Sequence, residues 1–264
     1  NPEKPEVMWQ FSEVVDGIAE ACRALEIPIT GGNVSFYNET LGKSIYPTPI
    51  LGVLGVLEDA DFAVGSAFDK EGDAIVLLDG AGAGAARSSA RDSSVEFSSS
   101  EYAKTMRGIV GGAPPAIDLA AEKRLIDCVV NLASAGLILS AHDVSDGGIA
   151  VTIAESCFAS DGLSADVNLS AGAASEAGIE VKTEPAEAAV FGERGARAVV
   201  SLSPASLARL DAVAAQYGVA AIRIGSVTRS EFRIQYEGTP VIRGDVTSFR
   251  KAWSESLVAA IESA

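Results

Sequence analysis

The first segment of the chain places apolar side chains at helical spacing. Within residues 8–26 they recur every three or four positions, at Phe11, Val14, Val15, Ile18, Cys22 and Leu25. This spacing predicts an amphipathic helix. Apolar runs at 27–30 and 49–57 predict two strands. The second run contains Gly52 and Gly55 and is expected to be a buried strand with close packing at its glycines.

Further along, helical and strand patterns mix without a strict βαβ repeat. Strands are predicted at 74–78, 137–141, 165–169, 198–202 and 220–227, with a hairpin formed by 232–236 and 240–242. Helices are predicted at 119–135, 148–158, 186–191, 204–217 and 249–261. Residues 80–100 are rich in Gly, Ala and Ser and predict a long loop. These patterns predict an α+β fold with helices packed on mixed sheets.

A polar, glycine-bearing stretch at 59–72 separates the two sets of elements. We therefore expect a domain boundary near 68–72, with one domain at 1–70 and another at 71–264. The chain begins at Asn1-Pro2 without a methionine and runs straight into a helix. This start suggests the middle of a longer protein.

Composition narrows the classes of partner. The chain has 264 residues, 48% hydrophobic and 21% charged, which is typical of a globular protein with material for one large or two smaller domains. The net charge of −16 argues against a nucleic-acid or anionic-membrane surface, because both need clustered Lys and Arg. Phosphate ligands stay compatible, since they need only local backbone donors or one or two cations.

Cysteine usage points to a reducing compartment. The three cysteines, Cys22, Cys128 and Cys157, are widely separated and form no C-x-x-C pair. The sequence contains no signal peptide and no run near the ~20 apolar residues of a membrane span. A cytoplasmic location is expected. Cys22 and Cys157 fall on predicted helices and are expected to be small core side chains.

Residues 31–39 (GGNVSFYNE) are the first candidate site. The glycine pair lets backbone approach a ligand closely, and exposed N–H groups there can face phosphate oxygens. Asn33, Ser35, Asn38 and Glu39 add oxygen ligands of the kind that Mg²⁺ takes. These features favour nucleotide chemistry. The alternative is a polar turn between two strands.

Residues 141–148 (AHDVSDGG) are the second candidate. His142 is the only histidine, so a general acid or base role for histidine would fall on it. One interpretation is a phosphate or metal site with Asp143 and Asp146. The other is a turn in which Asp146 or Ser145 caps a helix and His142 is tied to a carboxylate.

Two weaker patterns have local structural interpretations. Glu193, in the turn at 191–195, is expected to be a solvated turn residue. Ser98, with Glu101 three residues later, resembles a capping box at the start of a helix. The repeated glycines at 80–84 are weak support for a dinucleotide loop, because no helix and downstream acid follow.

Taken together, the strings resemble the phosphoribosylformylglycinamidine synthase family, within the aminoimidazole ribonucleotide synthetase-like superfamily. They occur in the family's order at 1–6, 19–25, 31–40, 45–49, 141–148 and 191–193. The resemblance implies the synthetase component's second half: a partial N-type domain, then a complete C-type domain. It implies ATP-dependent conversion of formylglycinamide ribonucleotide to the amidine, with Mg²⁺ and with ammonia from a glutaminase.

By the same resemblance, Gly32 contacts ATP, Asn33 ligates Mg²⁺ and Ser35 contacts the nucleotide substrate. The family's catalytic residues lie in the first half, so none is expected here, and the isolated half is expected to be inactive. No chemistry is assigned to His142, which does not match the family's catalytic histidines. The doublet Gly31-Gly32 replaces an expected Ser-Gly.

The implied partners are the missing N-terminal half, a glutaminase subunit or domain, a small accessory subunit and a small-molecule substrate, with no nucleic acid and no membrane. Two alternatives stay open. The chain could be a non-catalytic scaffold that at most holds a structural nucleotide. It could also come from another superfamily member, such as a thiamine-phosphate kinase or a selenophosphate synthetase.

Overall fold

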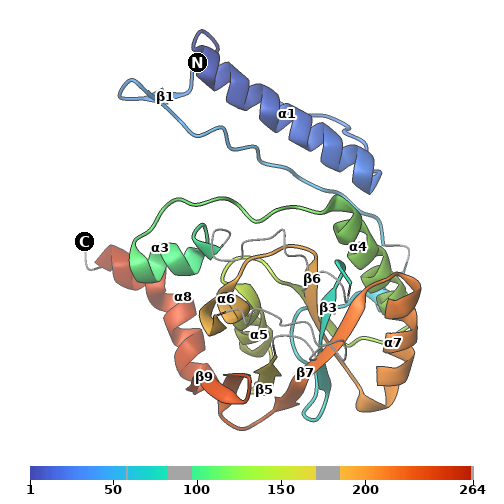
Figure 1. The fold of residues 1–264 in the computed structure, drawn as a ribbon. Helices are drawn as coiled ribbons and strands as arrows, with labels where there is room; N and C mark the ends of the chain where they lie inside the picture. Colours follow the sequence, from blue (N-terminus) through green and yellow to red (C-terminus); the bar gives the residue numbers. More distant parts are fainter. Residues whose placement is uncertain (58, 83–96, 171–184, 263–264) are drawn as a thin grey trace, which may run out of the picture. The chain divides into compact units, whose positions relative to one another are not determined.

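The computed structural model describes residues 1–57, 59–82, 97–170 and 185–262. The chain divides into two compact units, Asn1–Glu58 and Asp59–Ala264. Both units are drawn in Figure 1. Most of the predicted loop at 80–100 lies outside the described residues.

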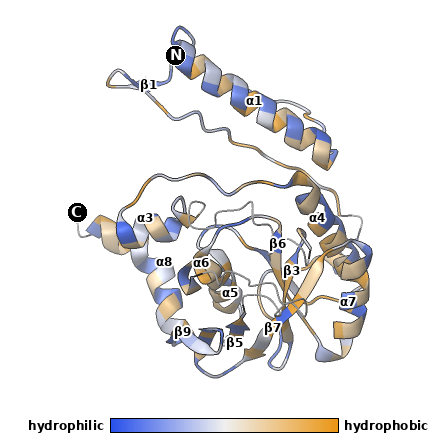
Figure 2. Cartoon of the chain, in the orientation of Figure 1, coloured by the Kyte–Doolittle hydropathy of each residue, from blue (hydrophilic) through white to orange (hydrophobic). Residues whose placement is uncertain are grey.

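The first unit is built on one long helix. Helix α1 (Pro5–Leu25) confirms the predicted helix and begins with Pro5 in its first turn, where the missing N–H costs nothing. Glu26 ends it in the left-handed conformation, with its N–H donated to the Cys22 carbonyl. Figure 2 shows hydrophobic and hydrophilic residues alternating along α1, as its amphipathic pattern requires. A two-residue ladder joins β1 (Glu39–Thr40) to β2 (Lys43–Ser44).

The strands predicted at 27–30 and 49–57 are wrong. Among the described residues, neither segment pairs with another strand, and the side chains of both segments are exposed. The exposed fraction is 96% for Ile50 and 93% for Leu54. A strand exists only where a neighbour completes its backbone hydrogen bonds. Within the described part of the first unit, the only ladder is the two-residue one, so an apolar run alone does not produce a strand.

The second unit contains a seven-stranded mixed sheet in the order β4-β6-β3-β7-β5-β8-β9. Neighbouring strands pair antiparallel except β5 and β8, which are parallel. The strands are β3 (Ala74–Asp79), β4 (Ser140–Asp143), β5 (Ser164–Leu169), β6 (Arg197–Leu202), β7 (Ala220–Thr228), β8 (Phe232–Tyr236) and β9 (Thr239–Gly244). The predicted α+β class with a mixed sheet is confirmed, although β4 begins three residues later than predicted.

Helices cover both faces of this sheet (Figure 1). They are α3 (Glu101–Arg107), α4 (Leu119–Ser134), α5 (Gly148–Phe158), α6 (Ala186–Phe191), α7 (Leu207–Gln216) and α8 (Val246–Glu262), with short 3₁₀ turns at Ala60–Phe62 and Pro204–Ser206. Within the described ranges, no helix has the length and apolar character that a membrane span needs.

Central strand β3 is buried along its whole length because it contributes to two cores. Val76 and Leu78 pack on the face covered by α4 and α7. Ile75 and Leu77 point to the other face, which α5 and α6 cover. Cys157 belongs to this second core, as predicted, and burial raises the pKa of its thiol to about 12.

Asp73, directly before β3, is a buried carboxyl group with an oxygen that the described residues leave unsatisfied. It is only 4% exposed, and within the described residues its Oδ2 has no hydrogen-bond partner. Burial, with repulsion from Asp69, raises the pKa of the Asp73 carboxyl. The folded state therefore binds this proton more tightly than the unfolded state. The resulting penalty grows as pH rises from the unfolded to the folded pKa and is complete above both.

We expect Asp73→Asn to raise the urea midpoint at pH 7, because it removes a buried unpaired charge. The gain should shrink as pH falls through the raised folded-state pKa of the Asp73 carboxyl, because the wild-type side chain then becomes protonated and neutral. Asp211→Asn, on the exposed surface of α7, is the control and should change stability by no more than about 0.5 kcal/mol. A gain that is independent of pH would contradict this explanation.

Candidate functional site

The candidate loop at 31–38 in the first unit is held to α1 by its C-terminal half. The Phe36 ring packs edge-on against Phe11, with centroids 5.4 Å apart and planes at 63°. The Tyr37 hydroxyl donates a hydrogen bond to Glu3 at 3.4 Å. Tyr37 adopts a left-handed backbone with φ of 62°. These contacts fix where the loop leaves the helix surface.

Two of the four expected oxygen ligands are engaged in the loop's own structure. The Asn38 side-chain amide donates to the Ser35 carbonyl at 3.2 Å. Glu39 accepts a hydrogen bond from the Lys4 ammonium at 2.8 Å, and this contact lowers the pKa of the Glu39 carboxyl. Asn38 and Glu39 therefore organise the loop, and the side chains of Asn33 and Ser35 are left for a ligand.

Gly32, Asn33 and Ser35 are all exposed. A side chain added at Gly31 or Gly32 would meet no atom within 4 Å, so a ligand can approach this backbone closely. Within the described ranges, no group of three or more His, Cys, Asp or Glu side chains could hold a metal ion. Because Mg²⁺ demands six oxygen ligands, this loop offers only part of a shell, which phosphates, water or other protein groups would complete.

In the second unit, the structure brings together three strings that the sequence singled out separately. Glu193 Oε1 accepts the backbone N–H of Glu101 at 2.8 Å and that of Gly147 at 2.9 Å. The expectation of a solvated turn residue is therefore wrong. The first N–H groups of a helix have no partner within the helix, and here one carboxylate serves donors at the starts of both α3 and α5.

Aromatic and glycine residues of these strings also pack against one another. Tyr102 stacks on Phe191, with ring centroids 4.6 Å apart. Gly148 has φ of 64°, and a Cβ there would lie 2.7 Å from the Phe191 backbone and 2.8 Å from the Gly192 carbonyl oxygen. The start of α5 thus approaches the end of α6 so closely that only glycine, which has no Cβ, fits at position 148.

The two predicted caps differ from the structure. Ser100, not Ser98, caps α3, because its hydroxyl accepts the Ala103 N–H at 3.2 Å. Neither Asp146 nor Ser145 caps α5, because its N-cap residue is Gly147 and no local side chain caps the helix. Glu193, from a distant part of the chain, supplies the oxygen that accepts the Gly147 N–H at this helix start.

His142 is tied to a carboxylate, as one of the two sequence interpretations predicted. Its Nε2 lies 3.1 Å from Glu155 Oε2, and its Nδ1 lies 2.9 Å from the Asp143 carbonyl oxygen. The Trp253 indole donates to the other oxygen of Glu155 at 3.1 Å. Both ring nitrogens are thus engaged, which favours a structural role that links β4, α5 and α8.

Glu193→Ala is expected to lower the free energy of unfolding of the second unit by about 1–3 kcal/mol, because two N–H groups lose their acceptor. Glu193→Gln keeps an oxygen at that position and should lose less. Urea unfolding measures both, with exposed Glu262→Ala as control. Equal stability of the alanine variant and the wild type would contradict this role for Glu193.

Residues 70–237 match the family described as AIR synthase related protein, C-terminal domain, and residues 1–57 match the corresponding N-terminal domain. The phosphoribosylformylglycinamidine synthase subunit PurL of Thermobifida fusca is 40% identical over 259 residues, 98% of this chain and 30% of that protein. PurL of Moorella thermoacetica is 37% identical over 97% of this chain and 32% of that protein.

Solved structures share the fold. T. maritima PurL complexed with FGAR superposes with a TM-score of 0.56 at 23% identity, covering 72% of this chain and 30% of that one. T. maritima PurL complexed with ADP gives a TM-score of 0.50 at 25% identity, covering 71% and 27%. This chain spans about 30% of the length of the curated PurL relatives that it matches.

Proposed function

Because this chain belongs to the AIR synthase related family, we propose that it is the C-terminal part of a phosphoribosylformylglycinamidine synthase. The whole protein would convert formylglycinamide ribonucleotide to the amidine in purine biosynthesis, using ATP and ammonia released from glutamine. The observation that carries the proposal is 40% identity to a curated PurL subunit over 98% of this chain.

The proposed reaction has two steps. The amide oxygen of formylglycinamide ribonucleotide attacks the γ-phosphoryl group of ATP, which forms an iminophosphate and releases ADP. Ammonia then adds to the activated carbon, the C–O bond breaks, and phosphate leaves with the former amide oxygen. Such chemistry depends on positioning the reactants and on neutralising phosphate charge.

Within this reaction we assign three contacts to the loop at 31–38. The backbone at Gly32 would contact ATP, the Asn33 amide oxygen would ligate Mg²⁺, and the Ser35 hydroxyl would contact the nucleotide substrate. The loop supports these roles because its glycines are open and its Asn33 and Ser35 side chains are exposed. No residue of this chain is assigned a catalytic proton transfer.

The proposed site is composite. The N-terminal remainder of the protein would supply the catalytic residues and the carboxylates that complete the Mg²⁺ shell. A glutaminase subunit or domain would supply ammonia, and a small accessory subunit would join the assembly. We therefore expect this chain alone to be inactive.

The experiment that tests the reaction is ADP release by the reunited protein, in which this chain is joined to the N-terminal remainder. ATP, Mg²⁺, ammonia and formylglycinamide ribonucleotide are supplied, and each is omitted in turn. We expect release that requires all four. A folded assembly that instead consumes ATP with thiamine monophosphate, releasing ADP, or with selenide, releasing AMP and phosphate, would belong to another superfamily member.

A further inference from the structure

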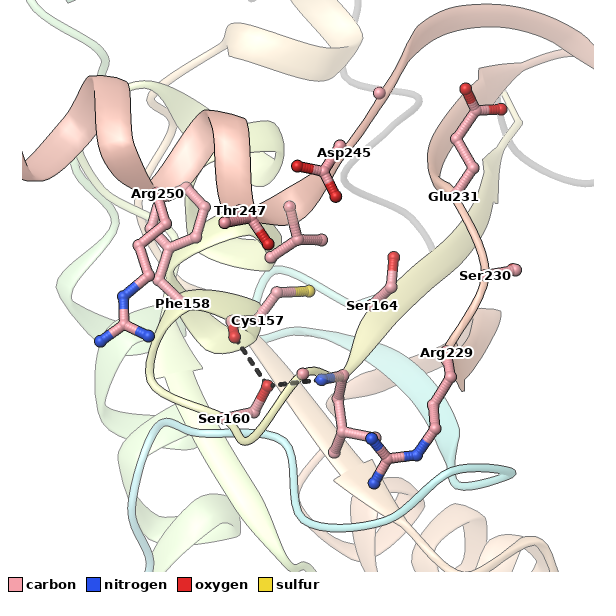
Figure 3. Close-up of a pocket in the computed structure, with 14 residues that line it drawn as sticks. Cys157, Phe158, Ser160, Ser164, Arg229, Ser230, Glu231, Asp245, Thr247 and Arg250 are labelled. Atoms are coloured by element: carbon pink, nitrogen blue, oxygen red, sulfur yellow. Dashed lines mark hydrogen bonds between the residues drawn. The ribbon is translucent and has the colours of Figure 1, made fainter.

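A hollow in the second unit lies at the C-terminal end of α5, at the opposite end of this helix from the hydrogen bond between Glu193 and Gly147. Its volume is about 550 Å³, within the range of ligand pockets. The end of α5, the start of β5, the turn between β7 and β8 and the start of α8 form its walls (Figure 3).

Ser164, in the first position of β5, is the unexplained polar group of this pocket. The residue is only 3% exposed, and within the described residues its Oγ has no hydrogen-bond partner. Neighbouring Ser160 differs, because its hydroxyl donates to the Cys157 carbonyl and accepts the Leu163 N–H. Figure 3 shows the Ser164 hydroxyl directed into the hollow. A buried hydroxyl without a partner costs free energy unless a ligand or water satisfies it.

The pocket carries two charges of each sign. Asp245 and Glu231 lie above Ser164 in Figure 3, and the Arg229 guanidinium lies below it. Arg229 donates from Nη1 to the Asp161 carbonyl at 3.2 Å, and its Nε lies 3.8 Å from Glu71 Oε2, so the guanidinium is oriented and its Nη2 is left for a ligand. Arg250 adds a second cation to the lining.

Asp245 lines the pocket, and Ser248 holds its carboxylate in place. Its Oδ2 accepts the Ser248 N–H at 2.8 Å and the Ser248 hydroxyl at 3.0 Å, and these bonds lower the pKa of the Asp245 carboxyl. The carboxylate is therefore ionised at neutral pH and fixed in direction. Asp245 also occupies the N-terminus of α8, so that helix end is not available to an external anion.

The floor of the pocket is apolar. Cys157 and Leu163 line it and are 1% and 3% exposed. The thiol of Cys157 is neutral at pH 7, because burial raises its pKa to about 12, so it offers no nucleophile. The floor suits a small uncharged group and no covalent step.

We propose that this pocket binds a free α-amino acid with a small uncharged side chain. The carboxylate pairs with Arg229, the ammonium group pairs with Asp245 and Glu231, and the Ser164 hydroxyl bonds the ligand between them. A pocket with balanced charges favours a zwitterion, because a ligand of one sign leaves the opposite pair of charges unmatched. This site is independent of the nucleotide chemistry proposed above.

The test is calorimetric titration of the full chain with L-serine, beside N-acetyl-L-serine, which lacks the ammonium group, and L-serinamide, which lacks the carboxylate. We expect saturable binding of L-serine and at least about tenfold weaker binding of each analogue. Ser164→Ala should weaken L-serine binding about fivefold and Arg229→Gln about tenfold. The control Arg209→Gln, on exposed α7, should leave binding unchanged.

The ligand series keeps the test decisive even where a variant fails to fold, because it uses the wild-type chain. Absence of L-serine binding would overturn the proposal. Equal affinity for L-serine and either analogue would overturn recognition of both ends. Binding of inorganic phosphate or ribose in preference to L-serine would assign the pocket to a different ligand class.

Discussion

Replacing Asn33 with alanine in the reunited protein is expected to lower the rate of ADP release about 100-fold, as when a metal-site or charge-stabilising group is removed. The amide oxygen of Asn33 would ligate the Mg²⁺ that neutralises phosphate charge in the transferring group. We also expect a higher Mg²⁺ concentration for half-maximal rate, because the remaining shell binds the ion more weakly. The thermal midpoint should not change, since Asn33 is exposed and its side chain has no hydrogen-bond partner among the described residues.

Asn131→Ala is the matched control for this prediction. Asn131 is also an exposed asparagine, but it lies on α4 in the second unit. The rate of ADP release by this variant, and the Mg²⁺ dependence of that rate, should equal those of the wild type. If Asn33→Ala retains full activity with an unchanged Mg²⁺ requirement, the loop is not part of the metal site, and the chain acts as a scaffold in the enzyme.

Gly148→Ala is expected to lower the free energy of unfolding of the second unit by about 3–5 kcal/mol, near the upper end for single substitutions. Two costs add at this position. The left-handed backbone, with φ of 64°, disfavours any residue with a Cβ by about 1–2 kcal/mol. The new Cβ would also lie 2.7 Å from the backbone of Phe191, which belongs to α6 and cannot rotate away.

Gly136→Ala separates these two costs. Gly136 has nearly the same backbone, with φ of 60°, but nothing lies within 4 Å of a Cβ built there. Its loss should be only about 1–2 kcal/mol, the conformational part alone. Urea unfolding of both variants gives the comparison. Equal losses would show that the close approach between the start of α5 and the end of α6 has no energetic weight.

The sequence predicted correctly those elements whose own pattern of apolar residues matches the surfaces that they bury. Helices at 148–158 and 186–191 were predicted with the bounds that α5 and α6 have. The continuous apolar run at 74–78 predicted a strand, and β3 is buried because helices cover both of its faces. In these segments, propensity, periodicity and tertiary packing favour the same structure.

The failures come from information that lies far away in the chain. The run at 49–57 is as apolar as β3 but has no strand beside it among the described residues, so composition alone misled. Glu193 was missed because its two donors are 92 and 46 residues distant. An acidic residue in a glycine turn carried no local signal of that role. Sequence could find it only by asking which acceptor serves a helix start that lacks its own cap.

The candidate loop was located from residue types alone, but its organisation was not. Glycine, amide and hydroxyl residues at 31–39 indicated phosphate and Mg²⁺ chemistry. The pattern did not indicate that Asn38 and Glu39 hold the loop together while Asn33 and Ser35 stay available. That division depends on Lys4, 35 residues before Glu39, and on a hydrogen bond to the Ser35 carbonyl. The individual roles of Gly32, Asn33 and Ser35 came from the resemblance.

The fate of the amide oxygen tests the central proposal most directly. Formylglycinamide ribonucleotide labelled with ¹⁸O at that amide is turned over by the reunited protein with ATP, Mg²⁺ and ammonia. The released phosphate is then analysed by mass spectrometry. We predict one ¹⁸O atom in each phosphate, because the oxygen leaves the iminophosphate with the phosphoryl group. Unlabelled phosphate from a reaction that consumes ATP would contradict activation of the amide and, with it, the proposed synthase.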